Sequence, residues 1–237
     1  MLVDLANRLA TALHLPRQCE VCRTWSAASL CQACVTRFAA PVPRCRRCAS
    51  RLGAALPACG QCLREPPPFE QTVCVADYGF PWDQLITRFK FHDRPELATL
   101  LAQRLLHAVT VQGAERPQGL VAVPLSPQRL AERGHNQSWE LARRLGSALK
   151  LPCWSDMLQR PLDHAHQATL GRKDRLQNLR GALLFNAGLR SQLQGLHVAV
   201  IDDVMTTGAT VHEAARVLRQ AGASRVDVWV LARTGGD

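Results

Sequence analysis

The chain has 237 residues, of which 47% are hydrophobic, and it carries a formal net charge of +10 at pH 7. This length suits one full domain with a small appended one. The composition excludes disordered and collagen-like classes, and no apolar run approaches the ~18 residues of a membrane helix. The positive charge is compatible with nucleic acid, anionic lipid or polyphosphorylated ligands as partners and does not choose among them.

Residues 1–16 are interpreted as a short amphipathic helix. A targeting segment is disfavoured because Asp4 and Asn7 interrupt the apolar stretch and no basic start precedes it. Without a secretory signal, we expect the protein in the reducing cytoplasm. Ten cysteines would remain thiols there, and paired cysteines favour metal over disulfides.

Four CxxC pairs follow the predicted helix: Cys19/Cys22, Cys31/Cys34, Cys45/Cys48 and Cys59/Cys62. Their eight thiolates are enough for two tetrahedral zinc sites of four cysteines each, and structural zinc would replace the core that ~45 residues cannot build. Spacing does not decide which pairs share a metal, although sequential sharing (first with second, third with fourth) is favoured over interleaving. Redox dithiols and disulfides are the competing interpretations. The isolated Cys74 and Cys153 are interpreted as small buried hydrophobes.

The chain changes in character after the proline run at residues 66–68. We therefore predict an N-terminal helix and double zinc-ribbon module over residues 1–66 and a larger domain over 67–237. In chain order the larger domain has predicted strands over 72–80, 119–126, 195–203 and 224–234, and predicted helices over 82–91, 94–109, 136–149 and 208–222. Alternating strands and helices predict an α/β fold with a parallel sheet flanked by helices. The polar segment 160–181 predicts a long functional loop.

A candidate anion-binding segment lies between the strand that ends near Pro124 and the helix that starts near Asn136. It contains Arg129 and Arg133, followed by Gly134. An arginine guanidinium group can bind two diphosphate oxygens in a bidentate fashion, and glycine lets the backbone come close to the anion. In isolation, the same pattern also fits a solvated, arginine-rich helix start.

A second candidate segment combines the strand HVAVIDD (197–203) with the turn at 206–210. Asp202 and Asp203 follow an apolar run typical of a central parallel strand, and ligands bind at the carboxyl edge of such sheets. The small and hydroxyl residues of the turn lead into a helix start that suits phosphate. The two carboxylates suit ribose hydroxyls, or water on a Mg²⁺ ion that the ligand holds. Diol and phosphate together predict a ribose 5-phosphate ligand, whereas a plain strand end with Thr207 as a helix cap is the weaker alternative.

The string of four apolar residues, two acids, two spacers and T-T-G-x-T resembles the signature of type I phosphoribosyltransferases. Together with VAVPLSPQRLAERGHNQSWELARRL (121–145) and the CxxC pairs, it makes nearly the whole chain resemble the ComF/GntX family. Members of that family join a zinc-ribbon module to a type I phosphoribosyltransferase-like domain. Weaker matches are Tyr78, Lys90, Asp93, Gln167, Arg175, Asn178 and Phe185.

The resemblance implies roles for individual residues. The phosphoribosyl group would be bound by Asp202, Asp203, Thr206, Thr207, Gly208, Ala209 and Thr210. The pyrophosphate would be bound by Leu125, Arg129, Arg133, Gly134, Asn136, Gln137, Arg172 and Arg175. The catalytic set would be Asp202, Asp203, Arg133 and Lys90, with Mg²⁺ accompanying phosphoribosyl pyrophosphate.

Three departures from the family pattern limit these roles. Thr206 stands where 6-oxopurine enzymes often have an aspartate, and threonine cannot transfer protons near neutral pH, so hypoxanthine or guanine salvage is disfavoured. His135 stands where phenylalanine is usual. The segment 161–167 lacks a basic residue and a threonine often seen there, and its His164 and His166 are more simply interpreted as solvated than as acid–base groups.

Two functions remain open at this point. As an enzyme, the protein would transfer ribosyl 5-phosphate to an unidentified acceptor, with arginines stabilising the departing pyrophosphate. As a binding protein, it would sense a phosphoribosyl ligand while residues 1–70, with nine basic and four acidic side chains, contact single-stranded DNA or a partner. The ComF resemblance implies cytoplasmic DNA uptake in natural transformation, and the GntX resemblance implies gluconate use. A purely structural role for the zinc ribbons is compatible with either function.

Overall fold

The computed structural model describes residues 16–54, 56–91, 94, 96–161 and 181–235. The helix predicted over residues 1–16 and most of the loop predicted over 160–181 lie outside this part of the chain. The chain divides into two compact units, Met1–Pro41 and Val42–Asp237. The domain boundary proposed between residues 66 and 67 stays a prediction.

The described part of the first unit is a small cysteine-bearing module. Its strands β1 (Arg17–Gln18) and β2 (Trp25–Ser26) pair antiparallel, and helix α2 spans Gln32–Phe38. The Cys19 amide donates to the Thr24 carbonyl at 2.9 Å, which closes the turn between the two strands.

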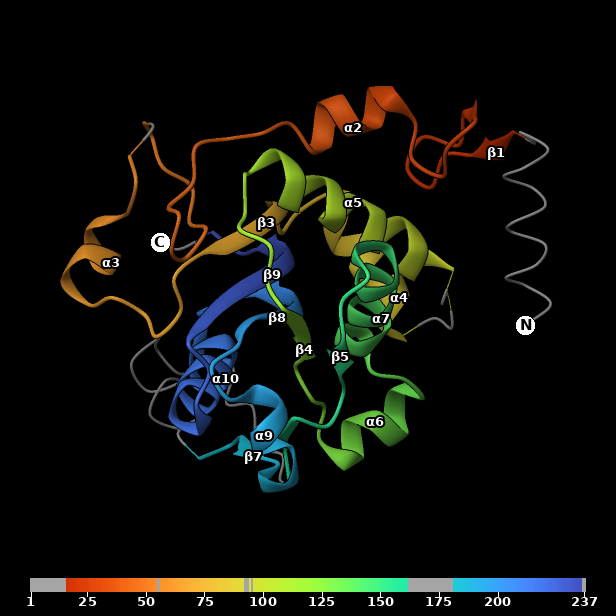
Figure 1. The fold of residues 1–237 in the computed structure, drawn as a ribbon. Coiled ribbons are helices and arrows are strands. Elements are labelled where there is room, and N and C mark those ends of the chain that lie inside the picture. The colour runs from red at the N-terminus through yellow and green to blue at the C-terminus, as the bar shows by residue number, and fades with distance from the viewer. Residues whose placement is uncertain (1–15, 55, 92–93, 95, 162–180, 236–237) are drawn as a thin grey trace. The chain divides into compact units, whose positions relative to one another are not determined.

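The second unit is built on a five-stranded sheet in the order β3-β9-β8-β4-β5 (Figure 1). The strands are β3 (Thr72–Asp77), β4 (Gly119–Ala122), β5 (Cys153–Trp154), β8 (His197–Met205) and β9 (Arg225–Arg233). Every pairing in this sheet is parallel, which confirms the predicted α/β fold with its parallel sheet. Strand β8 starts two residues later than predicted and continues two residues further.

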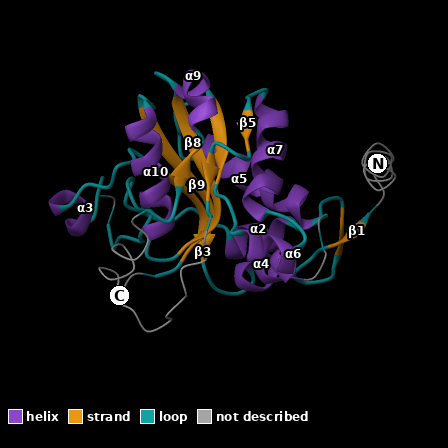
Figure 2. Cartoon of the chain, turned by 90° about the horizontal axis from the view of Figure 1, so that it is seen from below, coloured by secondary structure: helices purple, strands orange, loops and turns teal. Residues whose placement is uncertain are grey.

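Helices cover both faces of the sheet, and Figure 2 shows α10 on one side of it and α5 and α7 on the other. The described helices of this unit are α3 (Gly60–Arg64), α4 (Trp82–Phe91), α5 (Leu97–Val111), α6 (Pro127–Arg133), α7 (Gln137–Leu149), α9 (Arg190–Leu193) and α10 (Ala209–Ala221). Its described residues also include a short antiparallel pair, β6 (Leu158–Gln159) with β7 (Leu184–Phe185), and the 3-10 turn η1 (Ala187–Leu189). Glycine ends α10 as predicted, because Gly222 adopts the left-handed conformation with φ of 116°.

The core of the second unit lies between these layers. Strands β8 and β9 are apolar on both faces, as expected where helices cover each side of a parallel sheet. The same core includes Cys45, Cys48 and Cys62, together with Phe69, which follows the proline run. The Thr72 amide at the start of β3 donates to the Arg46 carbonyl at 2.8 Å. The second pair of CxxC motifs is therefore built into the α/β unit.

Within the part of the chain that the structure describes, no helix is both long and apolar enough to cross a membrane.

Candidate functional site

Asp202 and Asp203 lie at the carboxyl edge of the sheet. Ala122, the last residue of β4, pairs with Ile201, so both carboxylates extend beyond that strand while β9 continues beside Asp202. The Ser138 hydroxyl donates to Asp202 Oδ1 at 3.1 Å, and the Asp203 amide donates to the same oxygen at 2.9 Å. Burial and the neighbouring Asp203 carboxylate raise the pKa of Asp202 to about 7.

A lysine from another element meets this acid pair. Lys90, in the last turn of α4, places its Nζ 2.8 Å from Asp203 Oδ1, and both side chains are mostly buried. Arg133, the last residue of α6, is also close enough to interact with this carboxylate. Burial lowers the pKa of its guanidinium, and the charge of Asp203 partly opposes that shift. The fold thus brings the predicted catalytic groups to one edge of the sheet.

The turn after β8 leads directly into α10. Gly208 has a left-handed φ of 81°, and a Cβ atom there would lie 2.6 Å from Met205 Cε. The left-handed conformation favours glycine, and a larger residue would also displace the end of the Met205 side chain. The Thr207 hydroxyl accepts from the Ala209 amide at 3.4 Å, while the Thr206 side chain is exposed. The turn ends at a helix N-terminus, where backbone amides and the helix dipole favour an anion.

The loop between β4 and α7 is held in place by residues that cap helices α6 and α7. The Ser126 hydroxyl accepts from the Arg129 amide at 3.3 Å to begin α6, and Gly134 ends that helix with φ of 73°. Asn136 then caps α7 and donates its Nδ2 to the Val123 carbonyl at 3.1 Å, which ties the loop to the end of β4. Leu125 lies inside the loop so defined.

His135 connects this loop to α4. Its Nδ1 lies 3.0 Å from the Arg133 carbonyl oxygen and its Nε2 lies 3.1 Å from the Phe89 carbonyl oxygen. The ring also packs against Phe89, with centroids 5.7 Å apart. Histidine thus keeps an aromatic ring at this position and adds polar contacts that phenylalanine cannot make.

The Arg133 side chain is held on two sides. Its Nη1 donates to Gln137 Oε1 at 3.1 Å, and its guanidinium carbon lies 4.8 Å from the centre of the Phe91 ring. Such a cation–π contact fixes the plane of the guanidinium without neutralising it. Arg133 therefore stays available for an anionic ligand beside the acid pair.

The eight CxxC cysteines form two separate clusters. The first joins Cys19, Cys22, Cys31 and Cys34, and the second joins Cys45, Cys48, Cys59 and Cys62; within each, the sulfurs all lie within 4.8 Å of one another. The cysteines therefore group in the predicted sequential order, the first pair with the second and the third with the fourth. The sulfurs of Cys22 and Cys31 are 3.6 Å apart and those of Cys48 and Cys59 are 3.7 Å apart. These spacings match the ~3.8 Å edge of a tetrahedron with zinc–sulfur bonds of about 2.3 Å, so both clusters can bind zinc.

Hydrogen bonds prepare some of these thiols for a metal. The Cys31 amide donates to Cys19 Sγ at 3.4 Å, and the Cys59 amide donates to Cys45 Sγ at 3.3 Å. Hydrogen bonding with Thr24 lowers the pKa of Cys22 to about 6. At Cys59, burial acts to raise the pKa, but hydrogen bonds with Cys62 outweigh it and the pKa falls to about 7. A thiolate is the form that binds zinc.

Comparisons with known proteins agree with this architecture. The family model for the phosphoribosyl transferase domain matches residues 164–237. The chain is 38% identical over 229 residues to the DNA utilization protein YhgH of Salmonella typhimurium, which covers 94% of this chain and 99% of that protein. It is 34% identical over 177 residues to competence protein F of Haemophilus influenzae, covering 72% of this chain and 76% of that protein. The chain belongs to the ComF family.

A further relative of this ComF-family protein is YhgH of Escherichia coli K12, which is 39% identical over 176 residues; the match covers 73% of this chain and 76% of that protein. Several residues that the resemblance singled out lie outside the described residues: Asp93, His164, His166, Gln167, Arg172, Arg175 and Asn178. Their roles stay predictions.

The structure of this ComF-family protein also adds residues that the sequence did not single out. Ser138 reaches Asp202 from the first turn of α7, and Phe91 supports Arg133. The position of Ser138, two residues after a helix-capping asparagine, was the one weak indication in the sequence that it could lie at the site. Nothing local marked Phe91, because its partner comes from a different helix.

Proposed function

We propose that the carboxyl edge of the sheet binds phosphoribosyl pyrophosphate, or a related ribose 5-phosphate ligand, together with Mg²⁺. The observation that carries the proposal is the position of Asp202 and Asp203 at the end of β8, immediately before the glycine turn that begins α10. One strand end thus offers acceptors for a diol and, a few residues later, donors for a phosphate. Ribose 5-phosphate carries both of these groups on one small sugar.

Each group in the site has a distinct task in this proposal. Asp202 and Asp203 accept from the ribose hydroxyls, and the turn at 206–210 binds the 5-phosphate through backbone amides and hydroxyls. Arg133, with Arg129 in the same helix, receives the pyrophosphate. Lys90, whose Nζ lies 2.8 Å from Asp203 Oδ1, would contribute a further positive charge beside the pyrophosphate.

The donor set fits a Mg²⁺ ion that arrives with the ligand. Carboxylate oxygens are suitable partners for the hydrated ion, but Lys90 already neutralises part of the charge of Asp203. The protein side chains alone would therefore bind Mg²⁺ weakly. The pyrophosphate would supply most of the oxygen ligands for the ion. When bound, Mg²⁺ would supply charge neutralisation at the pyrophosphate.

In an enzyme, this arrangement would assist departure of pyrophosphate from C1 of the ribose. The C1–O bond breaks while an acceptor nucleophile forms a bond to C1, and pyrophosphate leaves with the electron pair. Arg133 and Lys90 would stabilise the negative charge that develops on the leaving group. The acceptor is the open part of this proposal.

A second candidate function is handling of single-stranded DNA in the cytoplasm. Relatives named DNA utilization protein and competence protein F support it. In the first unit, Trp25 has 65% of its surface exposed, and its neighbours along the chain include Arg23. An exposed indole with nearby arginine suits stacking on unpaired bases and contact with phosphate.

Calorimetric titration with phosphoribosyl pyrophosphate and Mg²⁺ tests the ligand proposal. We expect Asp203→Asn to weaken binding at least about tenfold, since a charged acceptor is lost from the site. Asp156→Asn, an exposed carboxylate between β5 and β6, is the matched control and should bind like wild type. Absence of binding by the wild type, or equal binding by Asp203→Asn, would contradict the proposal.

Turnover and DNA binding need separate measurements. Release of pyrophosphate across a panel of bases, amines and nucleic acids would distinguish an enzyme from a sensor. For DNA, fluorescence anisotropy of labelled single strands across a salt series should show affinity that falls with salt. Trp25→Ala in the full chain should weaken it by about 1–3 kcal/mol. Salt-independent or unchanged binding would remove the DNA proposal.

A further inference from the structure

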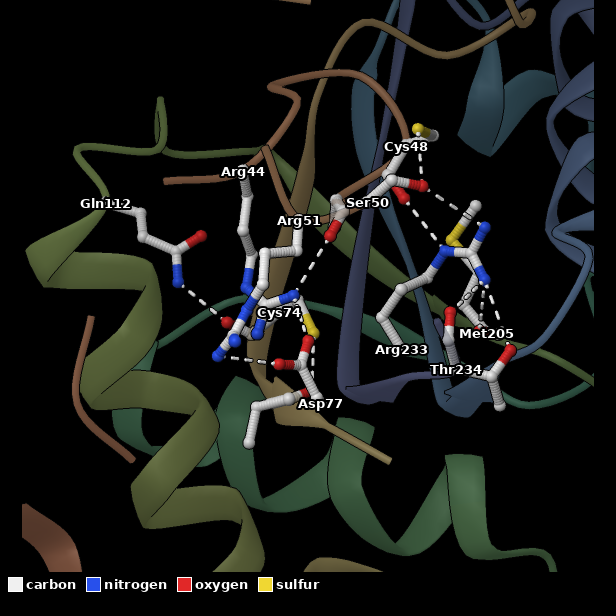
Figure 3. A network of polar contacts seen from close by, with 12 residues as sticks. Arg44, Cys48, Ser50, Arg51, Cys74, Asp77, Gln112, Met205, Arg233 and Thr234 are labelled. Atoms are coloured by element: carbon white, nitrogen blue, oxygen red, sulfur yellow. Dashed lines mark hydrogen bonds and ion pairs between the residues drawn. The ribbon is translucent and has the colours of Figure 1, made fainter. Parts of the chain in front are cut away.

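Arg233 connects the phosphate turn to the second cysteine cluster. It is the last residue of β9, its register partners are Met205 on β8 and Asp77 on β3, and only 3% of its surface is exposed. Figure 3 shows its guanidinium between the backbone near Cys48 and the backbone near Met205. A buried arginine at this position must serve several acceptors, because an unpaired buried charge is costly.

One side of the guanidinium binds the start of the phosphate turn. Its Nη1 donates to the Met205 carbonyl at 3.1 Å and to the Thr206 carbonyl, and it also donates to the Thr234 carbonyl at 2.8 Å. In a trans peptide the C=O and the following N–H point in opposite directions. The amides of Thr206 and Thr207 are therefore directed away from Arg233. These two amides belong to the turn that is proposed to receive the 5-phosphate.

The other side of the guanidinium binds the second cluster. Its Nε donates to the Cys48 carbonyl at 3.1 Å, and its Nη2 lies 3.5 Å from the Ser50 hydroxyl. That hydroxyl in turn accepts from Cys48 Sγ at 3.3 Å. The backbone turn that presents Cys48 to a metal is thus the same turn that holds Arg233 in place.

A second attachment joins the same cluster to the carboxyl edge of the sheet. Arg44 Nη1 donates to Asp77 Oδ1 at 2.6 Å and to the Ala49 carbonyl at 3.1 Å, and Arg51 Nη2 lies 3.0 Å from Asp77 Oδ2 (Figure 3). Asp77 is the register partner of Arg233. The cluster is therefore fixed against two neighbouring strand ends, and displacement of its backbone would be transmitted to Arg233.

We propose that Arg233 is a positioning residue that couples the second cysteine cluster to the phosphate turn. Metal binding by Cys45, Cys48, Cys59 and Cys62 orders the backbone that holds Arg233, and Arg233 orders the amides of the turn. Because such coupling is reciprocal, a ligand that occupies the turn strengthens metal retention at this cluster. The expected effect of a ligand on metal retention rests on the proposed ribose 5-phosphate site. The structural link between the cluster and the turn does not.

The coupling is specific to one of the two clusters. Cys19, Cys22, Cys31 and Cys34 belong to the other compact unit. We therefore expect a ligand at the phosphate turn to slow zinc release from the second cluster and to leave release from the first unchanged. Zinc release from the first cluster, followed in the chain with all its cysteines, is therefore an internal control.

The first experiment follows zinc release to a chromogenic chelator, with and without ribose 5-phosphate. To isolate the second cluster, the measurement uses a full chain carrying Cys22→Ser and Cys31→Ser. We expect ribose 5-phosphate to slow release about five- to tenfold, within the usual range of coupling between sites. Arg233→Lys should abolish this effect, because a single ammonium cannot serve acceptors on both sides as a guanidinium does.

Arg219→Lys is the matched control. Arg219 also donates to backbone carbonyls, those of Ala223 and Ser224 at the end of α10, but it contacts neither cluster nor turn through them. It should keep the ligand effect on zinc release. Ser50→Ala is a milder variant that removes the hydroxyl between Arg233 Nη2 and Cys48 Sγ but keeps the guanidinium, and it should reduce the effect even if Arg233→Lys proves poorly folded.

The second experiment needs no ligand. Hydrogen exchange of the peptide that covers residues 206–210 is compared before and after zinc removal in the same background. With Arg233 present, we expect hydrogen exchange in this turn to become faster after zinc removal. In Arg233→Lys, exchange should be fast both with and without zinc. Unchanged exchange on zinc removal would overturn the coupling.

The two experiments separate failure of this inference from failure of the proposed function. If the turn responds to zinc but ribose 5-phosphate changes nothing, the ligand assignment is wrong and the link through Arg233 stands. If ribose 5-phosphate binds and slows zinc release equally in wild type and Arg233→Lys, the ligand assignment stands and Arg233 is not the coupling residue.

Discussion

Lys90 Nζ lies 2.8 Å from Asp203 Oδ1, so a cation from the end of α4 meets the second of two adjacent carboxylates at the end of β8. Asp202 has a different environment, because Ser138 and the Asp203 amide donate to it. The two carboxylates therefore differ in their electrostatic environment. One is paired with a cation, and the pKa of the other is raised to about 7 by burial and by its charged neighbour.

The ion pair between Lys90 and Asp203 should show energetic coupling. In a double-mutant cycle of Lys90→Met and Asp203→Asn, we expect a coupling energy of about 1–3 kcal/mol, because each single change leaves a mostly buried charge without its partner. Urea denaturation at neutral pH measures the four free energies of unfolding. Additive single effects would show that the pair contributes nothing.

The hydrogen bond from Ser138 should be visible in both stability and binding. We expect Ser138→Ala to lower the free energy of unfolding by about 1 kcal/mol and to weaken ribose 5-phosphate binding, because Asp202 loses a fixed donor. Ser147→Ala, at an exposed position of the same helix, is the control and should be near neutral. Equal effects of the two variants would contradict this account.

Asp202 should make stability depend on pH with a particular sign. Its pKa is raised from 3.8 to about 7, so the folded protein keeps a proton that the unfolded chain loses at lower pH. The contribution of Asp202 to stability is therefore complete below about pH 4 and is lost as the pH rises towards about 7. Asp202→Asn should remove this loss, with a relative gain on the order of 1–2 kcal/mol at high pH. Denaturation curves of both proteins across this window provide the measurement.

Gly208 should be sensitive to an added side chain. Gly208→Ala combines a left-handed φ of 81° with a Cβ position 2.6 Å from Met205 Cε. We expect a loss of about 1–2 kcal/mol from the backbone conformation, together with weaker ligand binding because the strained residue lies in the proposed phosphate turn. At Gly53 nothing lies within 4 Å of an added Cβ, so Gly53→Ala is the control. Thermal unfolding and calorimetric titration distinguish the two effects.

The two cysteine clusters should differ in what they stabilise. We expect elemental analysis to find about two zinc ions per chain, one for each set of four thiolates. Cys62→Ser should lower the unfolding temperature of the α/β unit, since Cys62 belongs to its core. Cys34→Ser should release one zinc and leave that transition nearly unchanged, because Cys34 lies in the other unit. Calorimetric scans of both variants would show whether this asymmetry exists.

Much of the α/β unit could be read from local patterns. The apolar run before Asp202 predicted a central parallel strand, and the string from Asn136 predicted a capped helix, observed as α7 from Gln137 to Leu149. These signals are local because periodicity and capping depend on residues a few positions apart. The short strand β5 gave no such signal. It pairs with β4 where Gly119 leaves room for Trp154, whose ring atom lies 2.2 Å from the position of an added Cβ.

The sequence by itself determined the kinds of chemistry present: two acids before a glycine turn, arginines before a capped helix, and cysteines in four CxxC pairs that can bind a metal. The tertiary structure decided which of these groups meet. Lys90 against Asp203, Ser138 against Asp202, and Arg233 between Cys48 and Met205 join residues that are far apart along the chain. Such contacts leave no local pattern, because packing of whole strands and helices decides which buried charges and donors become neighbours.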